Sequence, residues 1–210
     1  MIQLRCLELS SVKPGDYEAL YARASAQRQS RADRYLRKED KLRCVAADAL
    51  IQLLPGYSRE ALAKTAAGKP YLTNQKLHFN LSHSGPWVVI AWGSSPVGID
   101  VEQIQMDRGK EALARRYFSE DEQAYLFSGE EQERAERFFR IWTGKESYLK
   151  YLGTGIDRPL NSFSVLKAPA KEMLQTWRLP DACMTLCCEE AEVSCRRLTL
   201  QQLWTEIKDK

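Results

Sequence analysis

The spacing of apolar side chains changes from helical to strand-like twice along this chain, and that alternation constrains the fold most. Over residues 39–54, Leu42, Val45, Ala49 and Leu53 repeat at helical spacing and form one stripe. Over residues 77–101 the pattern becomes an alternation of period two. Turn residues interrupt it twice, so it predicts three strands in an antiparallel meander.

The same order of elements recurs in the second part of the chain. Helical spacing returns after Glu102 and includes a long helix over residues 130–152, which Gly153 should end. Strands are expected again from residue 162 onwards. We therefore predict an α+β fold of two pseudo-symmetric halves, residues 1–102 and 103–210, each with helices packed on a small antiparallel sheet. A short helix is also expected over residues 58–65.

Composition is that of an ordinary soluble globular protein, with 44% hydrophobic and 28% charged residues among 210. No apolar run has the length of a membrane span, and the N-terminus lacks the layout of a signal peptide, so we expect a cytoplasmic protein that binds no membrane. The spacing of Cys183, Cys187 and Cys195 matches no standard zinc finger, which favours reduced thiols over a zinc site. We expect a monomer.

Positive charge is concentrated near the N-terminus rather than spread over the chain. The net charge of +3 is too small to indicate a nucleic-acid partner. Residues 23–43, however, contain eight basic side chains against three acidic ones, including Arg28, Arg31 and Arg43. This segment is either a solvated helical face or a docking site for phosphates or an acidic partner.

Two acidic side chains lie close together on the third predicted strand. Asp100 and Glu102 are two residues apart, so they project from the same face, about 7 Å apart along the backbone. Carboxylates this close repel one another, and a hard divalent cation, Mg²⁺ above all, would compensate their charge. The simpler interpretation is an exposed strand end with two solvated acids.

The long helix carries a third candidate carboxylate. Glu146 and Lys150 are four residues apart and share a face with Trp142. By themselves they could form only a weak surface ion pair. If Glu146 instead faced Asp100 and Glu102, three carboxylates could hold one Mg²⁺ with open positions for water and phosphates. Lys150 would then lie near the same phosphates. A metal ion, a lysine and a spare carboxylate together are the groups that phosphoryl transfer requires.

Two segments before this strand contain candidate phosphate contacts. Lys69 lies in Gly68-Lys69-Pro70, either as a phosphate-binding charge or as an exposed turn lysine. Ser82 and His83 lie at the end of a predicted strand. We interpret them as hydrogen-bond donors to a bound phosphate rather than as a nucleophile and base, because no triad can be argued from the sequence.

Taken in order, these segments resemble the 4′-phosphopantetheinyl transferase superfamily, in the two-halves type that activates surfactin synthetase. The family signatures are G-K-P, F-N-x-S-H-S, G-I-D-x-E and W-x-x-K-E-(S/A)-x-x-K-x-x-G-x-G. The chain has them at residues 68–70, 79–84, 98–102 and 142–155. Each motif alone is weak, but all four in order are highly specific. Val101 stands where some relatives have an acid or Gln, and its side chain should point away from the metal.

The resemblance implies transfer of phosphopantetheine from coenzyme A to a serine of an acyl- or peptidyl-carrier protein, with release of adenosine 3′,5′-bisphosphate. It implies that Asp100, Glu102 and Glu146 bind Mg²⁺, with Mn²⁺ as a substitute ion. Glu146 would also act as the general base and Lys150 would stabilise the phosphate. The implied coenzyme A contacts are Arg28, Arg31, Arg43, Lys69, Ser82, His83 and Lys150.

Two other classes of function compete with this interpretation. One is a protein that binds coenzyme A or a carrier without turnover, which the intact acidic residues and Lys150 disfavour. The other is a Mg²⁺-dependent nucleotide hydrolase, which the lack of a Walker-type glycine loop disfavours. The sequence does not distinguish a fatty-acid carrier from a peptide or polyketide carrier.

Overall fold

The computed structural model describes residues 1–10, 12–65, 68–74, 76–105, 108–153 and 159–208. Contacts between Cα atoms divide the chain into two compact units. The first unit contains residues 1–94 together with 192–210, and the second contains residues 95–191. Within the described ranges, no helix is both long enough and apolar enough to cross a bilayer.

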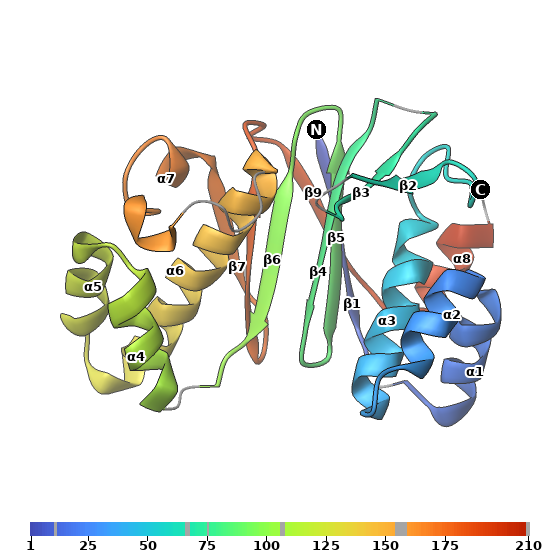
Figure 1. Cartoon of the computed structure of the whole chain (residues 1–210), viewed down its shortest axis with the longest axis horizontal. Helices are drawn as coiled ribbons and strands as arrows, with labels where there is room; N and C mark the ends of the chain where they lie inside the picture. Colours follow the sequence, from blue (N-terminus) through green and yellow to red (C-terminus); the bar gives the residue numbers. More distant parts are fainter. Residues whose placement is uncertain (11, 66–67, 75, 106–107, 154–158, 209–210) are drawn as a thin grey trace. The chain divides into compact units, whose positions relative to one another are not determined.

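A four-stranded sheet with helices packed on one face forms the first unit (Figure 1). The strand order is β4-β5-β1-β9, with antiparallel pairs except for the parallel pair β1–β9. The elements are β1 (Ile2–Glu8), α1 (Pro14–Arg23), α2 (Ala26–Asp33), α3 (Lys38–Ile51), β2 (Leu62–Lys64), β3 (Pro70–Leu72), β4 (His78–Ser84), β5 (Trp87–Gly93), β9 (Val193–Leu198) and α8 (Leu200–Lys208). Leu50 of α3 and Val88 and Ile90 of β5 are fully buried in the core between helices and sheet.

A three-stranded antiparallel sheet of order β6-β8-β7 forms the second unit, and the long helix α6 packs on it (Figure 1). The elements are β6 (Gly98–Gln103), α4 (Arg108–Tyr117), α5 (Glu120–Phe127), α6 (Glu131–Leu152), the 3₁₀-helix η2 (Leu160–Ser162), α7 (Ala170–Met173), β7 (Leu174–Arg178) and β8 (Ala182–Cys187). Phe118, Phe138 and Ile141 are buried in its core. Gly153 ends α6 in the left-handed conformation, as the sequence predicts.

The α+β class is confirmed, and several local predictions need correction. The third strand of the predicted meander, β6, pairs with β8 rather than with β5, because β4 and β1 already occupy both edges of β5. The helix predicted over residues 58–65 is wrong, since β2 pairs there with β3. The strand predicted over residues 162–166 is also wrong. Acidic side chains of α5 accept hydrogen bonds from Ser164 Oγ and Val165 N there, in place of a neighbouring strand.

The boundaries of the two units differ from the predicted halves. β6 belongs to the second unit instead of ending the first. The last strand and helix return to the first unit, because β9 pairs with β1. The sheet of the first unit is therefore completed by residues from both ends of the chain.

Candidate active site

Strand β6 lies against helix α6 at a distance that only glycine permits at residue 98. A Cβ atom at Gly98 would lie 2.0 Å from Ser147 O and 2.3 Å from Tyr151 N, both backbone atoms of α6. Any other residue would therefore push the helix off the strand. This contact places the acidic positions of β6 next to the C-terminal half of α6.

Asp100 and Lys150 form an ion pair across this contact. Lys150 Nζ lies 2.7 Å from Asp100 Oδ1 and 3.1 Å from Ile99 O. Asp100 is almost fully buried, with 5% of its side chain exposed, while 27% of the Lys150 side chain is exposed. A buried carboxylate is therefore held by a cation that solvent, or a ligand, can still reach.

Glu146 lies one helical turn before Lys150, is half-buried, and faces the same region. Its burial raises the pKa of its carboxyl group, the nearby charge of Asp100 raises it further, and Lys150 lowers it. The helix glutamate therefore lies within electrostatic range of the strand aspartate, an arrangement that the sequence left open.

Glu102 lies on the same face of β6 as Asp100, two residues further along, and is half-buried. Within the described ranges, no three His, Cys, Asp or Glu side chains are gathered closely enough to count as a metal cluster. The three-carboxylate metal site therefore stays a prediction. The donors themselves suit a hard cation, because Asp100 and Glu146 are carboxylates brought together away from bulk water.

Hydroxyl groups lie beside Asp100, under α6. Thr185 of β8 is the register partner of Asp100, and its Oγ1 lies 2.7 Å from Thr143 Oγ1 of α6 and 3.1 Å from Thr176 Oγ1 of β7. Thr143 and Thr185 are fully buried. The sequence did not indicate this polar layer, because threonine at these positions is equally typical of a strand or of a helix core.

The sequence analysis also missed a second ion pair, between Lys145 and Glu122. Lys145 Nζ lies 2.7 Å from Glu122 Oε2, and both side chains are fully buried. Lys145 also donates to Leu160 O and Phe163 O, each at 2.7 Å. Glu122 is also part of the N-terminal cap of α5, since Ser119 N donates to its Oε2 at 2.8 Å. Nothing in the sequence spacing indicates that Lys145 is its partner.

The three arginines predicted as coenzyme A contacts lie on α2 and α3 of the first unit. Arg28 donates from Nε to Asp48 Oδ1 at 3.2 Å, and Arg31 donates to the hydroxyl of Tyr35 at 3.3 Å. Arg43 donates to Gly85 O at 2.7 Å and forms an ion pair with Asp40. The basic segment of residues 23–43 is not one continuous helix, because residues 34–37 separate α2 from α3.

Lys69, Ser82 and His83 also belong to the first unit. Lys69 lies just before β3 and is half-buried, and this burial lowers the pKa of its ammonium group. Ser82 and His83 are adjacent on β4, so their side chains point to opposite faces of the sheet. His83 is opposite Val88, which belongs to the core under the helices. His83 is therefore directed to the helix-covered face.

Comparison with known proteins decides the family. The family model described as "4'-phosphopantetheinyl transferase superfamily" matches residues 96–201, which include β6 and α6. The chain belongs to this superfamily. A 4'-phosphopantetheinyl transferase of Bacillus subtilis is 35% identical over 165 residues, which cover 72% of this chain and 70% of the relative. The resemblance stated from the motifs is confirmed.

Two further members of the superfamily agree with this assignment. The 4'-phosphopantetheinyl transferase Sfp of Bacillus subtilis (strain 168) is 32% identical, over 67% of this chain and 65% of the relative. The transferase gsp of Aneurinibacillus migulanus is 36% identical, over 72% of this chain and 65% of the relative. The chain is thus an enzyme of the phosphopantetheinyl transferase class.

Proposed function

We propose that this enzyme transfers 4′-phosphopantetheine from coenzyme A to a serine hydroxyl of an apo acyl- or peptidyl-carrier protein. Adenosine 3′,5′-bisphosphate is the leaving group. The observation that carries the proposal is the grouping of Asp100, Glu146 and Lys150 on β6 and α6, inside the region that matches the superfamily. Two carboxylates and a reachable lysine suit a reaction at a pyrophosphate.

Asp100, Glu102 and Glu146 would hold the metal ion, Mg²⁺ or Mn²⁺. The raised pKa of Glu146 supports this role, because it reflects two carboxylates placed together with limited access to water. When bound, the ion would neutralise charge on the pyrophosphate and on these carboxylates.

Lys150 would stabilise the negative charge of the phosphoryl group under attack. Its ammonium group is anchored by Asp100 and Ile99 O, while about a quarter of the side chain remains exposed. A preoriented cation of this kind favours the transition state, because it needs no reorganisation as charge develops.

Glu146 would accept the proton of the carrier serine, directly or through one water. The serine oxygen then forms a bond to phosphorus, and the pyrophosphate P–O bond to the adenosine bisphosphate breaks. A carboxylate with a raised pKa is a stronger base than an ordinary glutamate, so its environment supports this role.

Coenzyme A contacts are proposed for Arg28, Arg31, Arg43, Lys69, Ser82 and His83. Among the arginines, the structure best supports Arg43, since it donates to Gly85 O at the turn that follows His83 on β4. Arg28 is held by Asp48, so it would have to divide its charge between that carboxylate and a phosphate. We further propose that the enzyme works as a monomer in the cytoplasm.

The experiment that tests the function is incubation of the protein with coenzyme A, Mg²⁺ and an apo-carrier protein, followed by mass spectrometry of the carrier. We expect the carrier to gain one phosphopantetheine group. An unmodified carrier, with coenzyme A still bound to the protein, would instead indicate a binding protein without turnover. A panel of fatty-acid, peptide and polyketide carriers, compared by kcat/KM, would identify the preferred partner.

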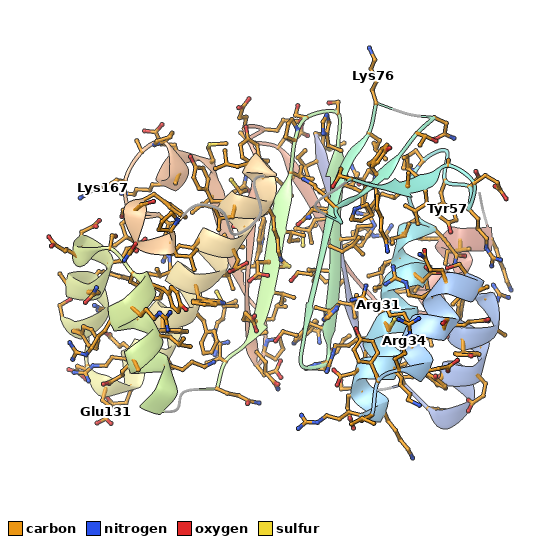
Figure 2. The ribbon with its side chains drawn as sticks, in the orientation of Figure 1. Arg31, Arg34, Tyr57, Lys76, Glu131 and Lys167 are labelled. Carbon is orange, nitrogen blue, oxygen red and sulfur yellow. The ribbon has the colours of Figure 1, made fainter. Side chains whose placement is uncertain are left out.

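The matched pair of variants is Glu146→Gln and Glu131→Gln. Both residues lie on α6, but Glu131 is exposed at its first turn, far from the β6 contact (Figure 2). Glu146→Gln should abolish transfer with the fold intact, whereas Glu131→Gln should transfer at the rate of the unmodified enzyme. Equal activity of the two variants would remove Glu146 from the proposed mechanism.

A further inference from the structure

A cavity of about 470 Å³ lies in the second unit, among α5, the N-terminal half of α6, α7, β7 and residues 165–166. Its volume is in the range of small-molecule sites in proteins. None of the residues proposed for catalysis lines it. The lining residues are Tyr125, Glu133, Glu136, Arg137, Arg140, Ile141, Val165, Leu166, Lys171, Leu174, Thr176, Trp177, Arg178 and Cys183.

The inner part of the cavity is apolar. Ile141, Val165 and Cys183 are at least 95% buried, and Leu174 and Trp177 are half-buried. A hydrocarbon or aromatic group bound against these side chains would leave water for an apolar surface, which favours binding.

The outer part carries an excess of positive charge. Arg137 is occupied by Glu133, at 2.7 Å, and Arg178 lies 3.8 Å from Glu136. Arg140 and Lys171 are exposed, and neither has a carboxylate at ion-pair distance within the part of the chain that the structure describes. Two cationic side chains thus remain available to an anion at the rim.

These charges reach the buried end of the cavity. Burial raises the pKa of the Cys183 thiol, and Arg178 and Arg140 both lower it through their charge, which places both guanidinium groups within electrostatic range of the floor. Both arginines therefore contribute positive potential inside the cavity as well as at its rim.

The cavity shares no lining residue with the proposed active site, and its rim lies toward the other end of α6. Arg140 precedes Lys150 by ten residues, which corresponds to about 15 Å along a helix. The inner end of the cavity comes closer, because Cys183 is the register partner of Glu102, and Thr176 Oγ1 lies 3.1 Å from Oγ1 of Thr185, the register partner of Asp100.

We propose that this cavity is a second binding site, for a small organic anion with an apolar body, namely a medium-chain aliphatic or an aromatic monocarboxylate. The carboxylate lies at the rim, against Arg140 and Lys171, and the apolar body lies on Ile141, Val165 and Trp177. The proposal does not depend on the transferase reaction.

Calorimetric titration of the whole protein with octanoate and with 1-naphthoate tests this site. The titrations are done in excess coenzyme A and Mg²⁺, so that the reaction site is filled. The uncharged analogues octanamide and 1-naphthamide are titrated in parallel. We expect the acids to bind at least tenfold more tightly than the amides. Whichever of the two acids binds more tightly identifies the preferred class, aliphatic or aromatic. Absence of binding at millimolar acid, or equal binding of acid and amide, would overturn the proposal.

Charge reversal locates the binding. Arg140→Glu combined with Lys171→Glu should weaken binding of the acids at least tenfold, while transfer to a carrier stays unchanged. The control is Arg134→Glu combined with Lys167→Glu, which reverses two charges on α6 and beside α7 that do not line the cavity. Because all of these side chains lie at least partly in solvent, the variants should fold, which circular dichroism checks. Equal affinity in both double variants would place the ligand elsewhere and refute the assignment.

Discussion

Two lysine–carboxylate pairs lie little more than one turn apart on α6. They share the same nitrogen–oxygen distance but differ in burial and in surroundings. Lys145 pairs with Glu122 and Lys150 pairs with Asp100, and in each pair the nitrogen–oxygen distance is 2.7 Å. The first pair is completely buried, whereas 27% of the Lys150 side chain is exposed. Distance alone would not separate them.

The surroundings of Lys145 use its whole hydrogen-bonding capacity. Its ammonium group donates to Glu122 and to two backbone carbonyls, and it lies 4.3 Å from the centre of the Phe163 ring. Glu122 also accepts from the backbone of Ser119 and Val165. A pair satisfied in this way joins α5, α6 and residues 160–165, and it leaves no room for a ligand.

Lys150 has a different environment. A second carboxylate, Glu146, lies close enough to Asp100 to have its own pKa raised by it. One lysine then faces two carboxylates, and that local excess of negative charge favours binding of a further cation. The comparison teaches that charge balance and exposure, rather than the presence of an ion pair, separate the structural pair from Asp100–Lys150, the pair that we propose to be functional.

The largest effect on stability is expected from Lys145→Met. The change leaves the Glu122 carboxylate buried without its cation, which costs about 3–5 kcal/mol of unfolding free energy. Urea denaturation measures it, and the double variant Lys145→Met/Glu122→Leu should regain most of the loss, because it removes both charges. A loss below about 1 kcal/mol in the single variant would contradict the structural role.

Lys150→Met should have the opposite profile. Removing one preoriented charge from a reacting phosphoryl group lowers the transfer rate by about 100- to 1000-fold. Stability should fall less than in Lys145→Met, because the lysine is partly exposed and water can reach the Asp100 carboxylate once the lysine is removed. Steady-state transfer kinetics and urea denaturation test both parts, with Lys167→Met, at an exposed pair with Asp121, as the control. If Lys150→Met lost as much unfolding free energy as Lys145→Met, both pairs would be structural, and the distinction drawn between them would be wrong.

Gly98→Ala tests whether the functional pair depends on the strand–helix contact. The new methyl group would overlap the α6 backbone, so the helix must move away from β6, at a cost of about 1–3 kcal/mol. Lys150 and Glu146 move with it, so transfer should also fall. The control is Gly15→Ala, near the start of α1, where an added Cβ meets no atom within 4 Å. If Gly98→Ala keeps full activity, the close contact does not position the site.

Much of this site could be predicted from local pattern. Helical spacing places Glu146 and Lys150 on one face, and strand alternation places Asp100 and Glu102 on another. Both are properties of short segments, so one sequence suffices to derive them. The bounds of α6 follow from helical spacing and from Gly153 in the same way.

Long-range pairing could not be derived in this way. The pairing of β6 with β8 joins residues about eighty positions apart, and the parallel pair β1–β9 joins the two ends of the chain. Periodicity carries no information on which strand edges are already occupied. The partnership of Lys145 with Glu122 was missed for the same reason, since each residue looks locally like an exposed charge on a helix.

The smallest and most specific effect concerns Glu146→Gln in the absence of substrate. The raised pKa means that the folded protein binds a proton at Glu146 more tightly than the unfolded chain does, so the charged form is destabilising. At pH 7.5 without Mg²⁺, the variant should therefore melt about 1–3 °C above the unmodified protein. This difference should vanish as the pH falls below about 4.5, the ordinary pKa of a glutamate side chain.

Added Mg²⁺ should raise the melting temperature of the unmodified protein and much less that of the Glu146→Gln variant, because only the former has the third carboxylate. Differential scanning fluorimetry at two pH values, with and without Mg²⁺, separates these cases. Equal stabilisation of both proteins by Mg²⁺ would show that the ion binds without Glu146. Glu146 would then not be a ligand of the ion, and the negative charge that it adds beside Lys150 would not account for cation binding at this pair.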